Sequence, residues 1–204
     1  MRRRDGNSGA PVLQCSQGKR TTTPVQLHLW DRLLEHRPLP PPPASLMDIG
    51  QISSIGYQQR SLTELLDLLE GANVDVVVDV RETPWSYRRE FAKGNLTARL
   101  AERCIEYVHA KFAGNPKAIR RSAESHREVL TSYRQHLEKN DDILWDFDAL
   151  VGNLVREGKN VCLICYERHP EDCHRHIVLD GWMTRLGIAP DVLHLGPEGC
   201  ARFT

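Results

Sequence analysis

One apolar run, followed by a turn and a helical segment, constrains the fold of this chain more than any other feature. Val161–Cys165 is apolar throughout and rich in β-branched residues, as expected for a strand that is buried on both faces of a sheet. Pro170 then interrupts the chain, and we predict that Asp172 caps a helix whose apolar residues recur at helical spacing until Gly187. This order of strand, loop and helix is typical of a parallel sheet covered by helices.

The remaining segments repeat this alternation of strands and helices. Further strands are predicted at Ile49–Tyr57, Val74–Val80, Ile105–His109 and Val192–Leu195. Amphipathic helices are predicted after the capping box Ser61–Glu64 and over about Asn95–Cys104, Ser122–Leu137 and Trp145–Val155. Because short loops join these elements, we expect parallel strands with right-handed crossovers. The predicted fold class is a three-layer α/β/α sandwich around a mostly parallel, Rossmann-like sheet of about five strands.

Residues 1–45 differ from the rest in composition. Met1–Thr23 is polar and too poor in apolar residues to offset the entropy of ordering it. Val25–Arg37 has the spacing of a short amphipathic helix, which Pro38 and Pro40–Pro43 end in an extended spacer. We therefore expect a disordered or loosely helical extension over residues 1–45 and a single α/β domain over residues 46–204.

The charge is balanced overall and uneven locally. The chain carries 27 basic and 27 acidic side chains, so bulk charge favours neither nucleic acid nor an anionic membrane as a partner. Between Arg81 and Arg134, however, twelve Lys or Arg stand against six Glu. This local excess would make one end of the molecule basic, unless charges elsewhere on the surface even it out.

Cysteine usage and hydropathy bear on the cellular compartment. Six cysteines at uneven spacing do not match the disulfide framework of a small secreted domain, which favours reduced thiols. No apolar run approaches the roughly 18 residues of a membrane span, and the chain starts without an apolar signal core. We expect a soluble, cytoplasmic protein that does not associate with membranes.

Polar and reactive side chains follow the predicted strands at their carboxyl ends, where open parallel sheets bind ligands. The predicted ligand-binding residues are Tyr57, Arg60, Arg81, Arg175 and Cys165. The forked guanidinium groups suit a phosphate or a carboxylate, and the start of the helix adds free N–H groups. The alternative is that the arginines pair with Asp79 and Glu167 in a purely structural role.

Four residues form the predicted catalytic set. Cys173, in the first turn of a helix and followed by His174 and Arg175, is expected to have a depressed pKa and to act as a nucleophile or redox thiol. His174 would serve as acid or base with Glu167 orienting it, and Asp79 is a second carboxylate for proton transfer. Cys165 could act as a resolving thiol. A reduced thiol that only packs is the alternative for Cys173.

The cysteines also raise the possibility of a metal site. Cys162 and Cys165 have the spacing of a metal knuckle, but residues three apart on a strand point to opposite faces, so Cys162 is predicted to lie in the core. Cys165, Cys173 and His174 would supply three zinc ligands. A structural zinc site needs four, and no fourth is evident nearby. Zinc therefore remains an alternative, with no metal ligand assigned and no cofactor predicted.

Several short motifs occur together in this chain, namely Ile55-Gly56, Val78–Arg81 with Pro84 and Ser86, Gly114–Pro116, and Cys165–Glu167 with Cys173–Arg175. With these motifs the chain resembles the family known as domain of unknown function 488, over about Gln51 to Leu195. The resemblance implies a compact α/β domain whose motif residues gather at one edge, without a settled activity. Members of that family usually carry a His after the glycine of the first motif, where this chain has Tyr57.

Three functions are compatible with these features. The leading hypothesis is an enzyme that binds a phosphate- or carboxylate-bearing ligand, such as a nucleotide or nucleic acid, at Cys173–Arg175. The second is a non-catalytic module for nucleic acid or a protein partner, because the loop Trp85–Phe91 is aromatic and basic and Arg120 and Arg121 follow it. The third is a small zinc site.

Overall fold

The structure is a computed structural model that describes residues 49–188, 192–196 and 201–203. The predictions for residues 1–45 lie outside these ranges. In the part of the chain that the structure describes, no helix has the length and hydrophobicity that a membrane crossing requires.

A six-stranded sheet carries the fold. Its strands are β1 (Ile52–Gly56), β2 (Val76–Asp79), β3 (Glu106–His109), β4 (Val161–Cys165), β5 (Val192–His194) and β6 (Ala201–Phe203). They lie in the order β3-β2-β4-β1-β5-β6, and β1 to β5 run parallel. The predicted mostly parallel sheet is confirmed. The short β6, which pairs antiparallel with β5, has no counterpart in the prediction.

The helices are α1 (Leu62–Gly71), α2 (Lys93–Ala101), α3 (Lys117–Ser122), α4 (His126–Lys139), α5 (Asp142–Phe147), α6 (Asn153–Arg156) and α7 (His174–Arg185). The predicted capping box is present at α1, where the amide of Glu64 donates to the Ser61 hydroxyl at 3.1 Å and the amide of Ser61 donates to the Glu64 carboxylate at 2.6 Å. Local hydrogen bonding therefore defines the start of this helix, as its sequence indicates.

One detail of the predicted helices is wrong, and another helix is less regular than expected. The helix expected over Trp145–Val155 is present within the continuous helical run of α5, a π-helical turn at Asp148–Gly152 and α6. Asp172 is not the N-cap of α7, because it lies in a 3-10 turn over Pro170–Asp172, and Cys173 takes the N-cap position. A cysteine with extended backbone angles therefore begins the helix, and its side chain makes no capping hydrogen bond.

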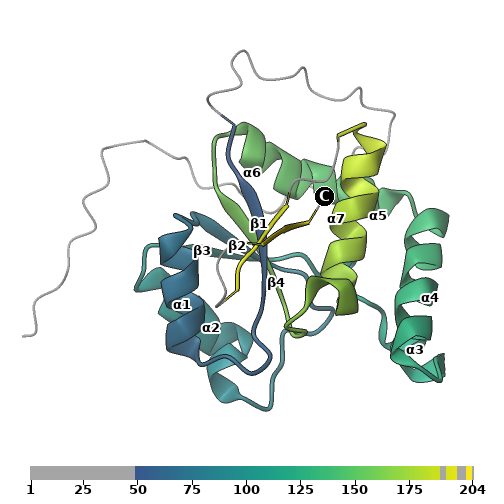
Figure 1. Ribbon diagram of the computed structural model, residues 1–204, viewed down its shortest axis with the longest axis horizontal. Coiled ribbons are helices and arrows are strands. Elements are labelled where there is room, and N and C mark those ends of the chain that lie inside the picture. Colours follow the sequence, from purple (N-terminus) through teal and green to yellow (C-terminus); the bar gives the residue numbers. More distant parts are fainter. Residues whose placement is uncertain (1–48, 189–191, 197–200, 204) are drawn as a thin grey trace, which may run out of the picture. The chain divides into compact units, whose positions relative to one another are not determined.

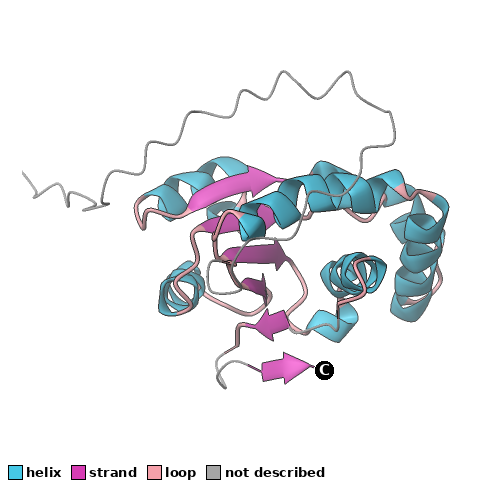
Figure 2. Cartoon of the chain, turned by 90° about the horizontal axis from the view of Figure 1, so that it is seen from above, coloured by secondary structure: helices cyan, strands magenta, loops and turns pink. Residues whose placement is uncertain are grey.

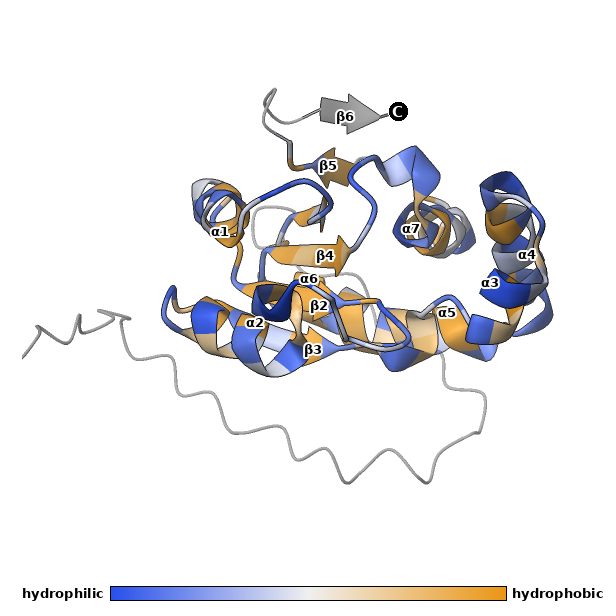
Figure 3. Cartoon of the chain, turned by 90° about the horizontal axis from the view of Figure 1, so that it is seen from below, coloured by the Kyte–Doolittle hydropathy of each residue, from blue (hydrophilic) through white to orange (hydrophobic). Residues whose placement is uncertain are grey.

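The helices cover both faces of the sheet, with α1 and α2 on one side and α4, α5 and α7 on the other (Figure 1). The view from above separates the helical layers from the strands (Figure 2), and the strands between them are predominantly hydrophobic (Figure 3). Side chains alternate between the two cores, so that Val77 packs with α1 and α2 whereas Val78 packs on the opposite face. The predicted three-layer α/β/α sandwich is confirmed.

The carboxyl ends of β1 and β4 lie side by side, with Gly56 next to Cys165 in the parallel register. From β1 the chain continues into α1 on one face, and from β4 it continues into α7 on the other. Open α/β sheets bind ligands at such a switch point, outside the carboxyl ends of the strands. The segment Cys165–Arg175 begins at this point.

Candidate functional site

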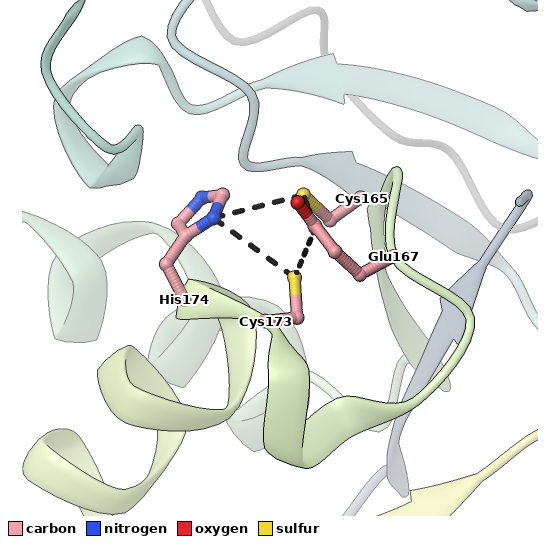
Figure 4. A group of neighbouring side chains, drawn as sticks. All are labelled: Cys165, Glu167, Cys173 and His174. Carbon is pink, nitrogen blue, oxygen red and sulfur yellow. Dashed lines mark hydrogen bonds between the residues drawn. The ribbon is translucent and has the colours of Figure 1, made fainter. Parts of the chain in front are cut away.

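Four side chains converge at the carboxyl end of β4 and point toward one another (Figure 4). Cys165 is the last residue of β4, Glu167 follows in the loop, Cys173 is the N-cap of α7, and His174 is its first residue. The sulfur atoms of Cys165 and Cys173 lie 3.3 and 2.9 Å from the same Glu167 carboxylate oxygen. The Nδ1 atom of His174 lies 3.7 and 3.9 Å from the same sulfur atoms.

The cluster is mostly shielded from solvent. Cys165, Cys173 and His174 are 3%, 1% and 7% exposed, whereas Glu167 is only partly buried. The potential ligand atoms of all four residues lie within 4.8 Å of one another. Among the described residues, no other group of His, Cys, Asp and Glu side chains is compact enough to hold a metal ion. The carboxylate is therefore the member of the group that solvent reaches most readily.

The loop that carries Glu167 is held against the end of β1. Gly56 approaches it so closely that a Cβ there would lie 1.7 Å from the carbonyl oxygen of Glu167. The side-chain oxygen of Gln58 accepts from the amide of Arg168 at 3.1 Å. The guanidinium of Arg175 donates to the carbonyls of Glu167 and Arg168 at 2.6 and 3.2 Å. These contacts fix the backbone on both sides of Glu167 and so set the position of its carboxylate.

A backbone carbonyl fixes the orientation of His174. The Nε2 atom of His174 lies 2.8 Å from the carbonyl oxygen of Val80, and because a carbonyl only accepts, this nitrogen carries the proton. In the neutral ring, Nδ1 then directs its lone pair toward the two sulfur atoms. Metal-binding imidazoles are commonly oriented in this way by a hydrogen bond from the second nitrogen.

The two thiols differ in their electrostatic environment. Burial disfavours the Cys173 thiolate, but the hydrogen bond from Cys165 and the positive charges of Arg175 and His174 lower its pKa well below the usual value. The hydrogen bond to Cys173, burial, and the negative charges of Cys173 and Glu167 raise the pKa of Cys165 well above the usual value. Cys173 is therefore the thiol that loses its proton first.

The carboxylate and the imidazole respond to the same negative charge. Burial, reinforced by the charge of Cys173 and the hydrogen bond with it, raises the pKa of Glu167 to about 7. Burial lowers the pKa of His174, but the hydrogen bond to Cys173 and the charge of Cys173 outweigh it, so the pKa is raised. A divalent cation at the centre would compensate this negative charge in place of protons.

Four of the six separations between the potential ligand atoms are close to those around a tetrahedral zinc ion. Zinc holds sulfur at about 2.3 Å and nitrogen or oxygen at about 2.0 to 2.2 Å, which places neighbouring ligand atoms about 3.3 to 3.8 Å apart. The contacts of the two sulfur atoms with Glu167 and His174, from 2.9 to 3.9 Å, bracket this range. Two thiolates and one carboxylate around a divalent ion leave one negative charge, which the buried guanidinium of Arg175 would balance.

Three of the other predicted site residues form a closed network at the end of β2. The buried Asp79 carboxylate accepts from Arg81 Nε at 2.8 Å, from Arg81 Nη2 at 2.5 Å, and from the Tyr107 hydroxyl at 2.6 Å. The Nη1 atom of Arg81 donates to the Tyr57 hydroxyl at 3.1 Å and to the Phe91 carbonyl at 3.0 Å. Every nitrogen of this guanidinium is thus engaged within the protein, and the pairing of Arg81 with Asp79 matches the structural alternative.

Arg60 and Arg175 also donate to the protein itself. Arg60 binds the carbonyls of Gly56 and Leu195 at 2.9 and 3.2 Å. Arg175 adds a hydrogen bond from Nε to the Ser54 hydroxyl at 3.2 Å to its two contacts with the Glu167 loop. Both side chains therefore support the end of β1, and direct binding of an anion by them stays a prediction.

Sequence reasoning gave Glu167 the role of orienting His174 and found no fourth metal ligand, whereas the structure places the Glu167 carboxylate against both thiols. A signal existed, because residues two apart in an extended segment point to the same side, and Glu167 lies two residues after Cys165. Cys162 packs in the opposite core from Cys165, as predicted.

The expectation of reduced thiols holds for three cysteines of the described ranges. Cys162, Cys165 and Cys173 are free. Cys104 is disulfide-bonded, so the expectation is wrong for this residue.

A Rossmann-like α/β fold with a Cys, Glu, Cys and His cluster at its switch point defines the class of this protein. Residues 61–181 match the family described as domain of unknown function DUF488. This match spans more than half of the chain, and the chain belongs to that family. The comparisons with curated proteins and with solved structures found no match.

Proposed function

We propose that this protein is a metal-dependent enzyme whose centre is a zinc ion bound by Cys165, Cys173, His174 and Glu167. The observation that carries the proposal is the convergence of four potential ligand atoms within 4.8 Å in a largely buried site. When ionised, two thiolates and a carboxylate repel one another, and removing such charges from water is costly without a compensating cation. A bound divalent cation accounts for their juxtaposition.

Glu167 is the ligand that a substrate or a water would replace. Cys165, Cys173 and His174 are buried on β4 and at the start of α7, whereas Glu167 is partly exposed in a loop. Catalytic zinc sites keep three protein ligands and one exchangeable position. Once displaced, the Glu167 carboxylate would be free to hold a proton beside the metal, which is the role of a general base.

The metal also gives a physical basis for the predicted anionic ligand. The guanidinium groups of Arg60, Arg81 and Arg175 already donate hydrogen bonds to backbone carbonyls of the protein. A zinc ion with one exchangeable coordination position would offer the positive charge that a phosphate or carboxylate oxygen requires. The proposed substrate class is accordingly a compound with a phosphate or carboxylate group, and the proposed reaction class is metal-assisted hydrolysis.

Metal content tests the centre directly. The full chain, purified from zinc-supplemented culture without chelators, is expected to contain about one zinc per chain by mass spectrometry of the elements. Cys173→Ser is expected to lose most of it. The matched control is Cys162→Ala, which removes a free thiol from the opposite core of the same sheet and should retain the metal. Less than about half an equivalent in the unaltered chain would contradict the proposal.

Cobalt substitution tests the exchangeable position. Co²⁺ in place of zinc should give the intense visible absorption of a tetrahedral ion and a thiolate charge-transfer band. Inorganic phosphate is expected to shift the visible bands, because phosphate replaces the Glu167 oxygen. A spectrum that phosphate leaves unchanged would show a closed structural centre and would remove the enzymatic part of the proposal.

A second candidate function is thiol chemistry at Cys173, because its pKa is lowered well below the usual value despite burial. In this case Cys173 would be the nucleophile, His174 the proton donor and Cys165 the resolving thiol. Iodoacetamide labelling separates the two candidates. The metal centre predicts that zinc protects Cys173 from alkylation and that a chelator exposes it, whereas free thiol chemistry predicts fast labelling in both conditions.

A further inference from the structure

Two aromatic side chains are exposed on the loop that follows β2. Trp85 and Tyr87 are 59% and 91% exposed, and their ring centroids lie 4.5 Å apart in an edge-on arrangement. Large aromatic side chains are otherwise mostly buried, because their burial contributes strongly to folding. An exposed aromatic pair is therefore a feature that a binding partner can use.

Basic side chains surround this pair. We define the basic rim as residues 85–93, which contain the aromatic pair, together with residues 111–121. The rim and Glu82 carry seven Lys or Arg against two Glu, an excess of five positive charges. Only two of the seven, Arg88 and Arg120, form ion pairs within the described residues, with Glu90 and Glu82. The other five are Arg89, Lys93, Lys111, Lys117 and Arg121, and all are exposed.

The two segments of the rim are joined in space. Arg120 donates to the Glu82 carboxylate at 2.7 Å and to the Asn115 carbonyl at 3.1 Å. Gly114 approaches so closely that a Cβ there would lie 2.3 Å from the amide nitrogen of Glu82. These contacts place the chain just before residue 85 beside residues 114–120, so that the two segments of the rim adjoin.

A buried acceptor without a hydrogen-bond partner belongs to the second segment of the rim. Asn115 is 5% exposed, and its side-chain oxygen has no hydrogen-bond partner. Every other buried polar side-chain atom of the described residues has one. A buried acceptor without a donor costs about 1 to 3 kcal/mol, and a ligand donor or a bridging water commonly satisfies such an atom.

The rim adjoins the proposed metal centre. The residue after β2, Val80, accepts the hydrogen bond of His174, and the loop of the rim begins a few residues later. At the other end of the loop, Phe91 stacks on Tyr57 at 4.4 Å, and Tyr57 contacts Tyr166 at 5.4 Å. Tyr166, which is 48% exposed, lies between Cys165 and Glu167 in sequence. A chain laid over the rim would thus pass beside the centre.

We propose that the basic rim binds single-stranded nucleic acid, with bases stacking on Trp85 and Tyr87 and phosphates contacting the unpaired Lys and Arg side chains. Base stacking on exposed aromatics and phosphate contacts from basic groups are how proteins hold single strands. A protein partner would also use aromatic and Arg side chains, but only an acidic one would compensate the excess of positive charge, whereas every nucleotide of a strand carries a phosphate. Binding by the rim stands independently of the metal; the identification of the strand as the substrate rests on the proposed function.

Fluorescence anisotropy with a labelled oligothymidylate of about 15 nucleotides tests this inference on the full, metal-loaded chain. We expect salt-sensitive binding, with Trp85→Ala/Tyr87→Ala about 10-fold or more weaker. Replacing Arg89, Lys117 and Arg121 by Gln should lower the slope of log affinity against log salt by about two. The matched control replaces Arg99, Lys139 and Lys159 by Gln, which lie outside the rim, and it should bind as the unaltered chain does.

The outcomes separate this inference from the proposed function. Cys173→Ser is expected to lose metal while it still binds the oligonucleotide, so failure of one result leaves the other standing. No binding at low salt would overturn the inference. Equal affinity for a duplex of the same length would overturn it too, because it would show charge attraction without stacking. An unchanged affinity in Trp85→Ala/Tyr87→Ala would have the same consequence.

Discussion

Two buried polar groups lie at the ends of neighbouring strands, and their hydrogen bonding differs. At the end of β2, the Asp79 carboxylate receives the guanidinium of Arg81 and the hydroxyl of Tyr107, so the acceptor meets matching donors. At the end of β4, two sulfur atoms, a carboxylate and an imidazole lone pair face one another. At most a few protons can be shared among them. The first group is satisfied by a fixed guanidinium and a hydroxyl, whereas in the second group both thiols contact one carboxylate oxygen and the four potential ligand atoms are close enough together for the proposed cation.

Burial and charge alone therefore do not distinguish a structural network from the proposed metal site. Both groups contain buried ionisable residues, and both lie at the sheet edge where ligands bind. The balance between fixed donors and acceptors separates them, because a saturated network stabilises the fold whereas an acceptor-rich cluster is able to take up a cation. The separation can be tested by changing each group and measuring both stability and metal content.

The largest expected effect is on the saturated network. Arg81→Met leaves the Asp79 carboxylate buried without its cation, and we expect the free energy of unfolding to fall by roughly 3 to 5 kcal/mol. Urea denaturation monitored by circular dichroism measures this. Folded Arg81→Met protein should still bind about one zinc. Loss of zinc with unchanged stability would mean that the two groups are not separate.

The next effect concerns the acceptor-rich cluster. Glu167→Gln removes the charge of the exchangeable ligand, and we expect zinc affinity to fall by about 10- to 100-fold while one zinc still binds. Competition with a chromogenic chelator measures the affinity. Glu171→Gln is the matched control, since its carboxylate lies in the same loop and is largely exposed. Equal losses in the two variants would remove Glu167 from the ligand set.

A smaller effect is expected at the edge of the network. Tyr57→Phe removes one acceptor of Arg81 Nη1, which keeps its contact with the Phe91 carbonyl, so we expect a loss of about 1 kcal/mol in stability. Tyr87→Phe, with its side chain exposed, should have no measurable effect on stability. A loss of more than about 3 kcal/mol would show that the hydroxyl of Tyr57 does more than complete the network.

A separate effect is expected from pH and arises at a residue outside both groups. Burial, with the charges of Arg175 and His176, lowers the pKa of His194 to about 4. The unfolded chain takes up this proton near pH 6.5, so the contribution of neutral His194 to stability is present above that pH and is lost as the pH falls toward 4. In the metal-free protein, His194→Gln should therefore lose less stability between pH 7 and pH 4 than the unaltered chain. Identical pH profiles would contradict this.

The sequence predicts most of this fold because its signals are local. The apolar runs, the capping box at Ser61 and the terminating Gly187 each act within a few residues, and the alternation of strand and helix determines the layers. Cys173 at the N-cap and the π-helical turn at Asp148–Gly152 follow from tertiary packing, and short-range spacing does not reveal them.

The sequence predicts which residues gather at the candidate site, but it does not predict which of their side chains contact one another. Placing Cys165, Cys173 and His174 together required only the strand, loop and helix order. The engagement of Arg81 by Asp79 and the contact of Glu167 with both thiols depend on distances of a few ångströms between loops. Such distances are fixed by long-range contacts, which single-sequence patterns do not contain.

Gly56 makes the proposed chemistry depend on a residue that donates no atom to it. Because its absent side chain leaves room for the carbonyl of Glu167, any substitution would push the loop outward while all four ligands remain in the sequence. An alteration at this position could therefore abolish activity in a chain whose reactive residues are all intact. Transplanting the four ligands into another sheet would for the same reason require a glycine at the end of the adjoining strand.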